Sequence, residues 1–152
     1  MDRATVETYE HRSDEWIAAR SPKRLPEAEA FGRTIAADWP SGSSTSSGPG
    51  GWRADLGCGP GWYTEALGAP TIALDATQAM LDVVPRYAPN ACRLRADLEA
   101  LPIRRGALAA AWANASYVHV PAERVPLALA DLHRAVRVGG AVQVNVIADR
   151  DS

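Results

Sequence analysis

Asp55-Leu56-Gly57-Cys58-Gly59-Pro60-Gly61 is the stretch on which the interpretation of the whole chain depends. Three glycines within five residues make a turn with almost no side chains, so a ligand can approach its backbone closely. Residues 53–56 before the turn are expected to form a strand. Residues 62–67 after it are expected to form a helix whose first N–H groups are free to bind a ligand. This arrangement favours a nucleotide-like ligand. The alternative is a glycine-rich surface turn, because a glycine pattern alone is a weak indicator.

Two further segments each place a carboxylate after a short strand. Residues 71–74 are expected to form a strand, and Asp75 at its end is placed to bond both hydroxyls of a ribose. Asp75 is also suited to cap the following helix, and the two roles are compatible. Residues 92–95 form a third expected strand, followed by Asp97 and Leu98. Asp97 is expected to accept a hydrogen bond from an adenine amino group, with Leu98 against the ring. The alternative for Asp97 is a capping role in its loop.

Strands and helices alternate after residue 52, which predicts an α/β fold. We expect a Rossmann-like, doubly wound, mostly parallel sheet that ends after the fifth strand, with right-handed crossovers. A ligand is expected at the C-terminal ends of the strands, beside the first strand, where the three acid-bearing loops meet. Two N-terminal helices, over 5–20 and 26–39, precede the sheet. The remaining expected elements are strands over 107–112 and 141–147 and helices over 77–85 and 122–136.

Taken in order, these segments resemble the class I S-adenosylmethionine-dependent methyltransferases. Residues 55–61 are similar to that family's first motif, which cradles the methionine part of the cofactor. Asp75 matches the acid that holds the ribose, and Asp97-Leu98 matches the pair beside the adenine. Residues 111–121 and 132–140 are similar to the family's fourth-strand motif and to its passage from helix into fifth strand. Five motifs in the right order are more specific than any one of them.

The resemblance implies an enzyme that moves a methyl group from S-adenosyl-L-methionine to a small-molecule acceptor and releases S-adenosyl-L-homocysteine. Asn114 is expected to contact the cofactor because Ala109, Ala110 and Trp112 stand where the family's fourth strand often carries an acid. Ala76, the neighbour of Asp75, is also expected to contact the cofactor. The full set of expected cofactor-binding residues is Tyr9, Asp55, Gly57, Cys58, Gly59, Pro60, Gly61, Asp75, Ala76, Asp97, Leu98 and Asn114.

Two residues outside the main motifs complete the expected site. Tyr9 lies in an N-terminal helix that often carries a cofactor-facing tyrosine in related enzymes, and the alternative is that its ring packs with Val6. His119 follows the fourth strand and is the candidate catalytic base, since an imidazole there is placed to take a proton from a hydroxyl or an amine. The alternative for His119 is a local role at the start of the next helix.

The chain departs from the family pattern at its C-terminal end. Val138 stands where the family usually has a proline, and the family's sheet normally continues through two more strands. The strand over 141–147 is therefore expected at or near a sheet edge, with Val142 and Val144 on a face that needs cover. An uncovered apolar edge strand predicts self-association through that edge.

Composition agrees with a single domain, since 152 residues match the usual ~150 for one domain. We expect it to comprise a helical segment (1–39) packed on the core, a flexible Ser/Gly/Pro loop (40–51) and a cofactor-binding core (52–152), and we expect that core to be C-terminally truncated relative to the family. The net charge of −2 disfavours nucleic acid as a partner. No apolar run approaches the ~20 residues that span a bilayer. Cys58 and Cys92 lack metal-ligand spacing, so we expect no metal, two free thiols and a cytoplasmic location.

Three alternative functions stay open from the sequence. A NAD(P)-binding Rossmann domain prefers one more residue before the last glycine of the turn and usually lacks an acid at position 55. An RNA methyltransferase is disfavoured by charge. A non-catalytic or truncated cofactor-binding fragment is suggested by where the sequence stops.

Overall fold

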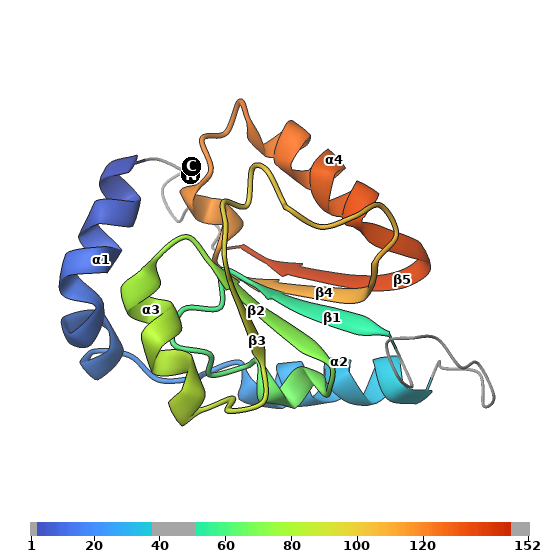
Figure 1. Cartoon of the computed structure of the whole chain (residues 1–152), viewed down its shortest axis with the longest axis horizontal. Helices are drawn as coiled ribbons and strands as arrows, with labels where there is room; N and C mark the ends of the chain where they lie inside the picture. Colours follow the sequence, from blue (N-terminus) through green and yellow to red (C-terminus); the bar gives the residue numbers. More distant parts are fainter. Residues whose placement is uncertain (1–2, 38–50, 147–152) are drawn as a thin grey trace.

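A computed structural model describes residues 3–37 and 51–146. Within them, five strands form one parallel sheet in the order β3-β2-β1-β4-β5 (Figure 1). The strand order reverses between β1 and β4, so the predicted doubly wound parallel sheet is confirmed. The predicted loop over 40–51 lies, apart from Gly51, outside the described residues, as does Ile147 of the predicted last strand. The strands are β1 (Trp52–Leu56), β2 (Thr71–Asp75), β3 (Cys92–Arg95), β4 (Leu108–Asn114) and β5 (Val136–Asn145).

Helices cover both faces of the sheet, as Figure 1 shows. On one face, Ala128 and Leu132 of α4 join the main apolar cluster with Leu56. On the other face, Ala28 of α2 packs in a smaller cluster with the fully buried Trp112 of β4. The helices are α1 (Arg3–Ala18), α2 (Leu25–Ala37), α3 (Gln78–Val83) and α4 (Val125–Ala135), and the short 3-10 turns are η1 (Glu65–Leu67), η2 (Val84–Arg86) and η3 (Tyr117–His119).

The prediction of a helix over 62–67 is wrong. Turns follow the glycines, and only Glu65–Leu67 form a 3-10 turn, η1. Gly61 has φ +88° and Gly68 has φ +85°, so left-handed backbone brackets the segment and leaves too few residues for two α-helical turns. Helix α2 packs directly on this segment, because a Cβ on Gly32 would lie 2.1 Å from the carbonyl oxygen of Ala66. The backbone N–H groups that follow the glycine turn therefore belong to turns and not to the start of an α-helix.

The last helix and the last strand also differ from their predicted bounds. Helix α4 begins at Val125, three residues later than expected, with a proline in its first turn. Pro lacks an N–H and is tolerated in the first turn, so Pro126 suits a start at this point. Strand β5 begins earlier than expected, at Val136, and its register against β4 shifts after that residue. The shift accommodates Gly139, which has φ +76°.

Among residues 3–37 and 51–146, strand β5 lies at an edge of the sheet, as the sequence predicted. Every residue of β4 except Asn114 is buried, whereas no residue of β5 is. Val144 packs against the main cluster. Val142 and Val146, two positions away on the same face, are 47% and 67% exposed.

Candidate functional site

The glycine turn follows β1 and is fixed by the neighbouring strand. The N–H groups of Gly57 and Cys58 both donate to the carbonyl oxygen of Leu74, at 2.8 and 2.9 Å. Gly57 and Gly59 have φ +68° and +54°, which favour glycine. A Cβ on Gly57 would lie 2.3 Å from Cβ of Ser116, so this glycine permits close packing within the protein. A Cβ on Gly59 would meet only the Trp16 ring, at 3.9 Å, so the space over Gly59 is open to a ligand.

Asp75 connects the end of β2 to the glycine turn. Its Oδ2 accepts a hydrogen bond from the N–H of Gly59 at 2.9 Å, and its Oδ1 accepts one from the N–H of Thr77, also at 2.9 Å. The second bond closes a turn just before α3, whose N-cap residue is Thr77, so the expected capping of that helix by Asp75 is wrong. Burial raises the pKa of Asp75, and the hydrogen bonds from Thr77 and Gly59 oppose that rise. A carboxylate oxygen has two acceptor positions, so this arrangement leaves capacity for a further donor.

Asp55 lies beneath the same turn. It is 1% exposed, and its Oδ2 accepts a hydrogen bond from Oγ1 of Thr64 at 2.7 Å. Burial raises its pKa to about 7, an effect that the Thr64 hydroxyl opposes and the nearby Asp75 carboxylate reinforces. At neutral pH the Asp55 carboxyl group is therefore close to the midpoint of its titration.

These groups open into a cleft of about 630 Å³ at the carboxyl ends of the strands. The catalytic candidate His119 lines it together with most of the predicted cofactor-binding residues. The predicted residues in the lining are Tyr9, Asp55, Gly57, Cys58, Gly59, Pro60, Asp75 and Asn114. The structure thus brings them together from the ends of β1, β2 and β4 and from helix α1.

Four predicted residues do not line this cleft. Leu98 is 1% exposed and packs in the main apolar cluster, while Oδ1 of Asp97 accepts a hydrogen bond from the N–H of Glu99 at 3.0 Å. Ala76 is partly buried, and its carbonyl oxygen accepts a hydrogen bond from Nε of Arg95 at 3.1 Å. Gly61 faces η2, where a Cβ would lie 3.2 Å from the Val84 side chain. The cofactor contacts of these four residues stay predictions.

An aromatic wall faces the glycine turn from helix α1. The rings of Trp16 and Trp62 stack with centroids 5.5 Å apart. Oη of Tyr9 lies 3.2 Å from Nε2 of His119, so Tyr9 contacts the cleft through this hydrogen bond as well as through its ring. Burial lowers the pKa of His119, the Arg20 charge lowers it further, and the Asp75 charge opposes both. The imidazole is therefore neutral at pH 7 and able to accept a proton.

Sequence reasoning missed Trp16 and Arg20 as cleft residues. Trp16 lines the cleft, although it belongs to none of the sequence motifs. Its ring centroid lies 6.0 Å from that of Tyr9, although non-helical backbone at Arg12 (φ −123°, ψ 22°) kinks α1 between the two residues, so helical spacing in the sequence alone could not place them together. The guanidinium of Arg20 lies 4.7 Å from the Trp16 ring centroid. Nothing in the sequence indicated that cation–π contact.

Two buried polar atoms in the cleft lining lack partners within the described part of the chain. They are Oγ of Ser116 and Nε1 of Trp16. Buried polar groups are normally hydrogen-bonded, so unsatisfied atoms at a cleft are characteristic of a functional site. Across residues 3–37 and 51–146 no cluster of three or more His, Cys, Asp or Glu side chains is arranged to hold a metal ion. No helix in those ranges has the length and apolar content that crossing a membrane requires.

Comparisons with known proteins agree with this geometry. The family model described as "Methyltransferase domain" matches residues 54–140. The malonyl-[acyl-carrier protein] O-methyltransferase of Erwinia pyrifoliae is 32% identical over 98 residues, which are 62% of this chain and 37% of that protein. The enzyme of the same description from Pseudescherichia vulneris is 36% identical over 97 residues, 62% of this chain and 38% of that protein. This chain thus spans well under half the length of these relatives.

Solved structures share the fold. The structure described as the DhpI-SAM-HEP complex has a TM-score of 0.72 at 23% identity, covering 97% of this chain and 66% of that one. DesVI of Streptomyces venezuelae has a TM-score of 0.65 at 19% identity, covering 100% of this chain and 60% of that one. At such identities these structures establish the fold and leave the ligand to be argued from the site.

Proposed function

The chain belongs to the methyltransferase domain family, and we propose that it transfers a methyl group from S-adenosylmethionine to a small-molecule acceptor. One observation carries the proposal. The glycine turn, the Asp75 carboxylate and the His119 imidazole, which come from three different strand ends, line a single cleft of about 630 Å³. Ligands of open α/β sheets bind at this edge, beside the point where the strand order reverses.

The residues present fit the cofactor. The open space over Gly59 suits a ligand held close to backbone, and the Asp75 carboxylate suits the paired hydroxyls of a ribose. The unsatisfied hydroxyl of Ser116 offers a further contact at the C-terminal end of β4. Helix α1 closes the cleft through Tyr9 and Trp16. We therefore propose that residues 1–39 and the core act as one domain.

S-adenosylmethionine supplies a methyl group already activated by the positive charge on sulfur. The protein's task is to position the acceptor in line with that methyl group and to exclude water. The Trp16–Trp62 stack covers the cleft on its α1 side. His119, neutral and hydrogen-bonded to Tyr9, receives the proton of an acceptor hydroxyl or amine.

Isothermal titration with S-adenosylhomocysteine and with NAD⁺ tests the cofactor assignment. We expect binding of the first and none of the second. Asp75→Ala should weaken binding by about 1.5–3 kcal/mol, the range for hydrogen bonds to a charged group. Asp82→Ala is the matched control, because its side chain is 63% exposed on α3 and it does not line the cleft. Equal affinities for the two variants would remove Asp75 from the cofactor site.

The titration also addresses the alternative functions. A NAD(P)-binding domain would bind NAD⁺ in preference. A non-catalytic fragment would bind S-adenosylhomocysteine and transfer no methyl group to any acceptor. The relatives from Erwinia pyrifoliae and Pseudescherichia vulneris are described as acting on a protein-bound malonyl group, so malonyl-carrier protein belongs among the acceptors to be screened beside free small molecules.

A further inference from the structure

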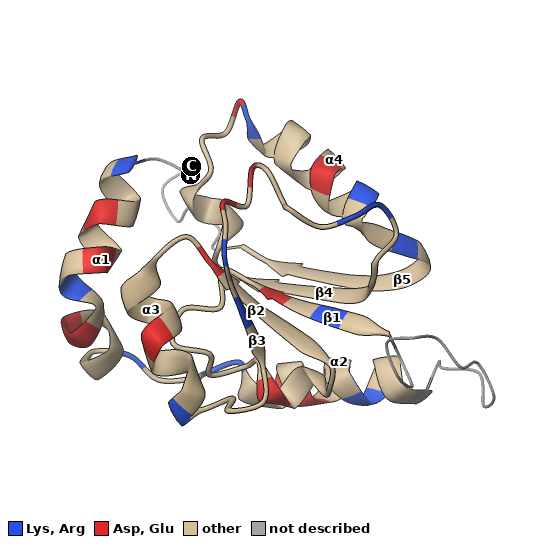
Figure 2. Cartoon of the chain, viewed as in Figure 1, with Lys and Arg blue, Asp and Glu red and all other residues tan. Residues whose placement is uncertain are grey.

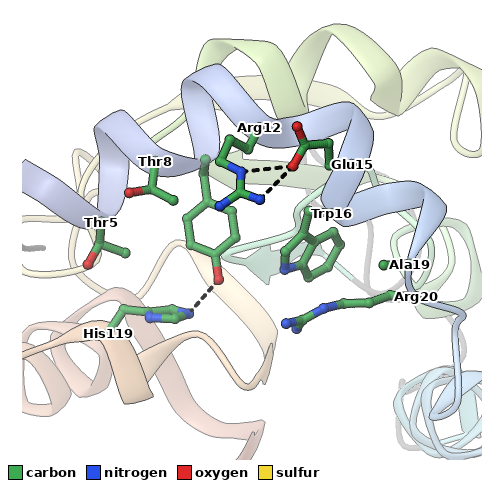
Figure 3. A pocket seen from close by; sticks show the side chains of 9 residues that line it. Thr5, Thr8, Arg12, Glu15, Trp16, Ala19, Arg20 and His119 are labelled. Atoms are coloured by element: carbon green, nitrogen blue, oxygen red, sulfur yellow. Dashed lines mark hydrogen bonds and ion pairs between the residues drawn. The ribbon is translucent and has the colours of Figure 1, made fainter.

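A second hollow adjoins the cleft, and Figure 3 shows its lining. Its volume is about 590 Å³, within the ~300–1,000 Å³ of pockets that hold small ligands. We call it the α1 hollow, because helix α1 and the two residues after it supply all of its lining except His119. The glycine turn and Asp75 line the cleft and not the α1 hollow. Five residues line both: Tyr9, Trp16, Ala19, Arg20 and His119. Two ligands can therefore lie side by side and meet at His119.

The charges in the α1 hollow do not cancel. Its lining contains two guanidinium groups, those of Arg12 and Arg20, and one carboxylate, that of Glu15. Arg12 pairs with Glu15 through Nε and Nη2, at 2.8 and 2.6 Å. His119 is neutral at pH 7 because burial lowers its pKa. One positive charge is left over, and it belongs to Arg20.

Arg20 is placed to use that charge on a ligand. No acidic side chain in the described residues forms an ion pair with it, and its guanidinium is held 4.7 Å from the Trp16 ring centroid. In Figure 3 the side chain extends beneath Trp16 toward His119. Its charge also lowers the pKa of His119 across this space. A planar guanidinium with free N–H groups is the side chain best suited to bind a carboxylate or a phosphate.

We propose that the α1 hollow receives the methyl acceptor and that this acceptor is a small acid whose anionic group lies against Arg20, an assignment that rests on the proposed function. The anion neutralises the unpaired charge of the hollow. The group that receives the methyl then lies toward Tyr9 and His119, at the junction with the cleft. Carboxylates and phosphates share this chemistry, and the experiment separates them.

The test is an NMR titration of the protein saturated with S-adenosylhomocysteine. The probes are 3-hydroxypropanoate, its neutral amide 3-hydroxypropanamide, and inorganic phosphate, followed through the side-chain signals of Arg20 and His119. We expect one of the anions to bind about tenfold or more tightly than the amide, because charge-assisted hydrogen bonds are the strong ones. The tighter of the two anions identifies the anionic group.

Three variants locate the binding. Arg20→Gln should weaken anion binding about tenfold. Glu15→Gln, which releases Arg12 from its ion pair, should strengthen it about twofold. Arg105→Gln, an exposed arginine outside both linings, should change nothing.

The inference is overturned if the amide binds as well as the anions, or if Arg20→Gln loses no more affinity than Arg105→Gln. It is also overturned if Arg20→Gln weakens S-adenosylhomocysteine binding but not anion binding, because Arg20 would then serve the cofactor carboxylate. Failure of wild-type protein to bind S-adenosylhomocysteine contradicts the proposed function instead. The anion titration of the ligand-free protein still tests the hollow in that case.

Discussion

The cleft has a sheet wall, made of the glycine turn, Asp55 and Asp75, and a helix wall, made of Tyr9, Trp16 and Arg20 of α1 and the residues after it. Short buried hydrogen bonds hold the sheet wall, where Asp55 is 1% exposed. The side chains of the helix wall are half-buried or exposed, and that of Arg20 is exposed. Helix α1 packs against α3, where Oε2 of Glu10 accepts a hydrogen bond from the N–H of Gln78 at 2.9 Å.

This difference separates two tasks. A rigid, buried wall suits a ligand that never changes, such as a cofactor. A wall of long, exposed side chains on one helix tolerates substitution. Substitutions at exposed positions usually change the free energy of unfolding by less than ~0.5 kcal/mol. We infer that acceptor choice depends on the helix wall, and the following predictions test that division.

Gly59→Val should have the largest effect, on the sheet wall. Valine at φ +54° is strained, and its side chain would fill the space between the turn and Trp16. We expect S-adenosylhomocysteine binding to be abolished in isothermal titration. Gly139→Val is the control, because Gly139 also has positive φ but has nothing within 4 Å of its Cβ position. Equal losses in both variants would mean that strain alone, and no ligand contact, explains the result.

His119→Ala comes next, at the junction of the two walls. A positioned base typically contributes ~10²–10⁴-fold to rate, so single-turnover methyl transfer should fall by that factor while cofactor affinity changes little. Tyr9→Phe removes the hydroxyl that contacts His119 and should give a smaller loss with the same pattern. An unchanged rate in His119→Ala would return this residue to a structural role.

Asp55 should give the sheet wall a pH-dependent stability. Burial raises its folded-state pKa from 3.8 to about 7, so the folded protein holds more protons than the unfolded chain between those values. The free energy of unfolding should therefore fall as pH rises from about 4 to about 7, by up to ~1.4 kcal/mol for each pKa unit. Asp75, whose pKa is also raised, adds to the same trend.

Urea unfolding between pH 4 and pH 8 measures that slope. Asp55→Asn keeps an acceptor for Thr64 and should flatten the slope, leaving the part due to Asp75. Asp82→Asn, at an exposed position on α3, should keep the wild-type slope. An identical slope in wild type and Asp55→Asn would show that Asp55 titrates near its ordinary pKa.

The smallest effect concerns the β5 edge, where Val146 also lines the cleft. Val142 and Val146 are exposed beside unpaired backbone, so the protein should self-associate at high concentration. The double variant Val142→Lys/Val146→Lys should be monomeric with little change in thermal stability, as sedimentation at several concentrations and a melting curve would show. A wild-type protein that is monomeric throughout would refute association through this edge.

Prediction from sequence succeeded where a local pattern and the three-dimensional contact coincide. The acids at positions 55 and 75 lie at the C-terminal ends of β1 and β2, so strand direction alone was enough to bring them to one edge of the sheet. Prediction failed where contacts between segments far apart in the sequence determine the local structure. The segment after Gly61 is a good helix by composition, but left-handed glycines bracket it and α2 presses on it. Arg20 stands after its helix with no motif around it, and only its contact with Trp16 places it at the cleft.

The two cysteines differ in a way that provides a tool for these experiments. Cys58 is buried in the glycine turn, its Sγ contacts the carbonyl oxygen of Gly59 at 3.3 Å, and burial raises its thiol pKa. Cys92 is exposed at the start of β3, on the opposite edge of the sheet from β5. Thiolates are the reactive form, so a maleimide dye near neutral pH should label Cys92 and spare Cys58. The unmodified sequence thus offers a single attachment point for a fluorescent dye. The dye would lie on the edge of the sheet opposite β5, and its signal would report self-association through the β5 edge.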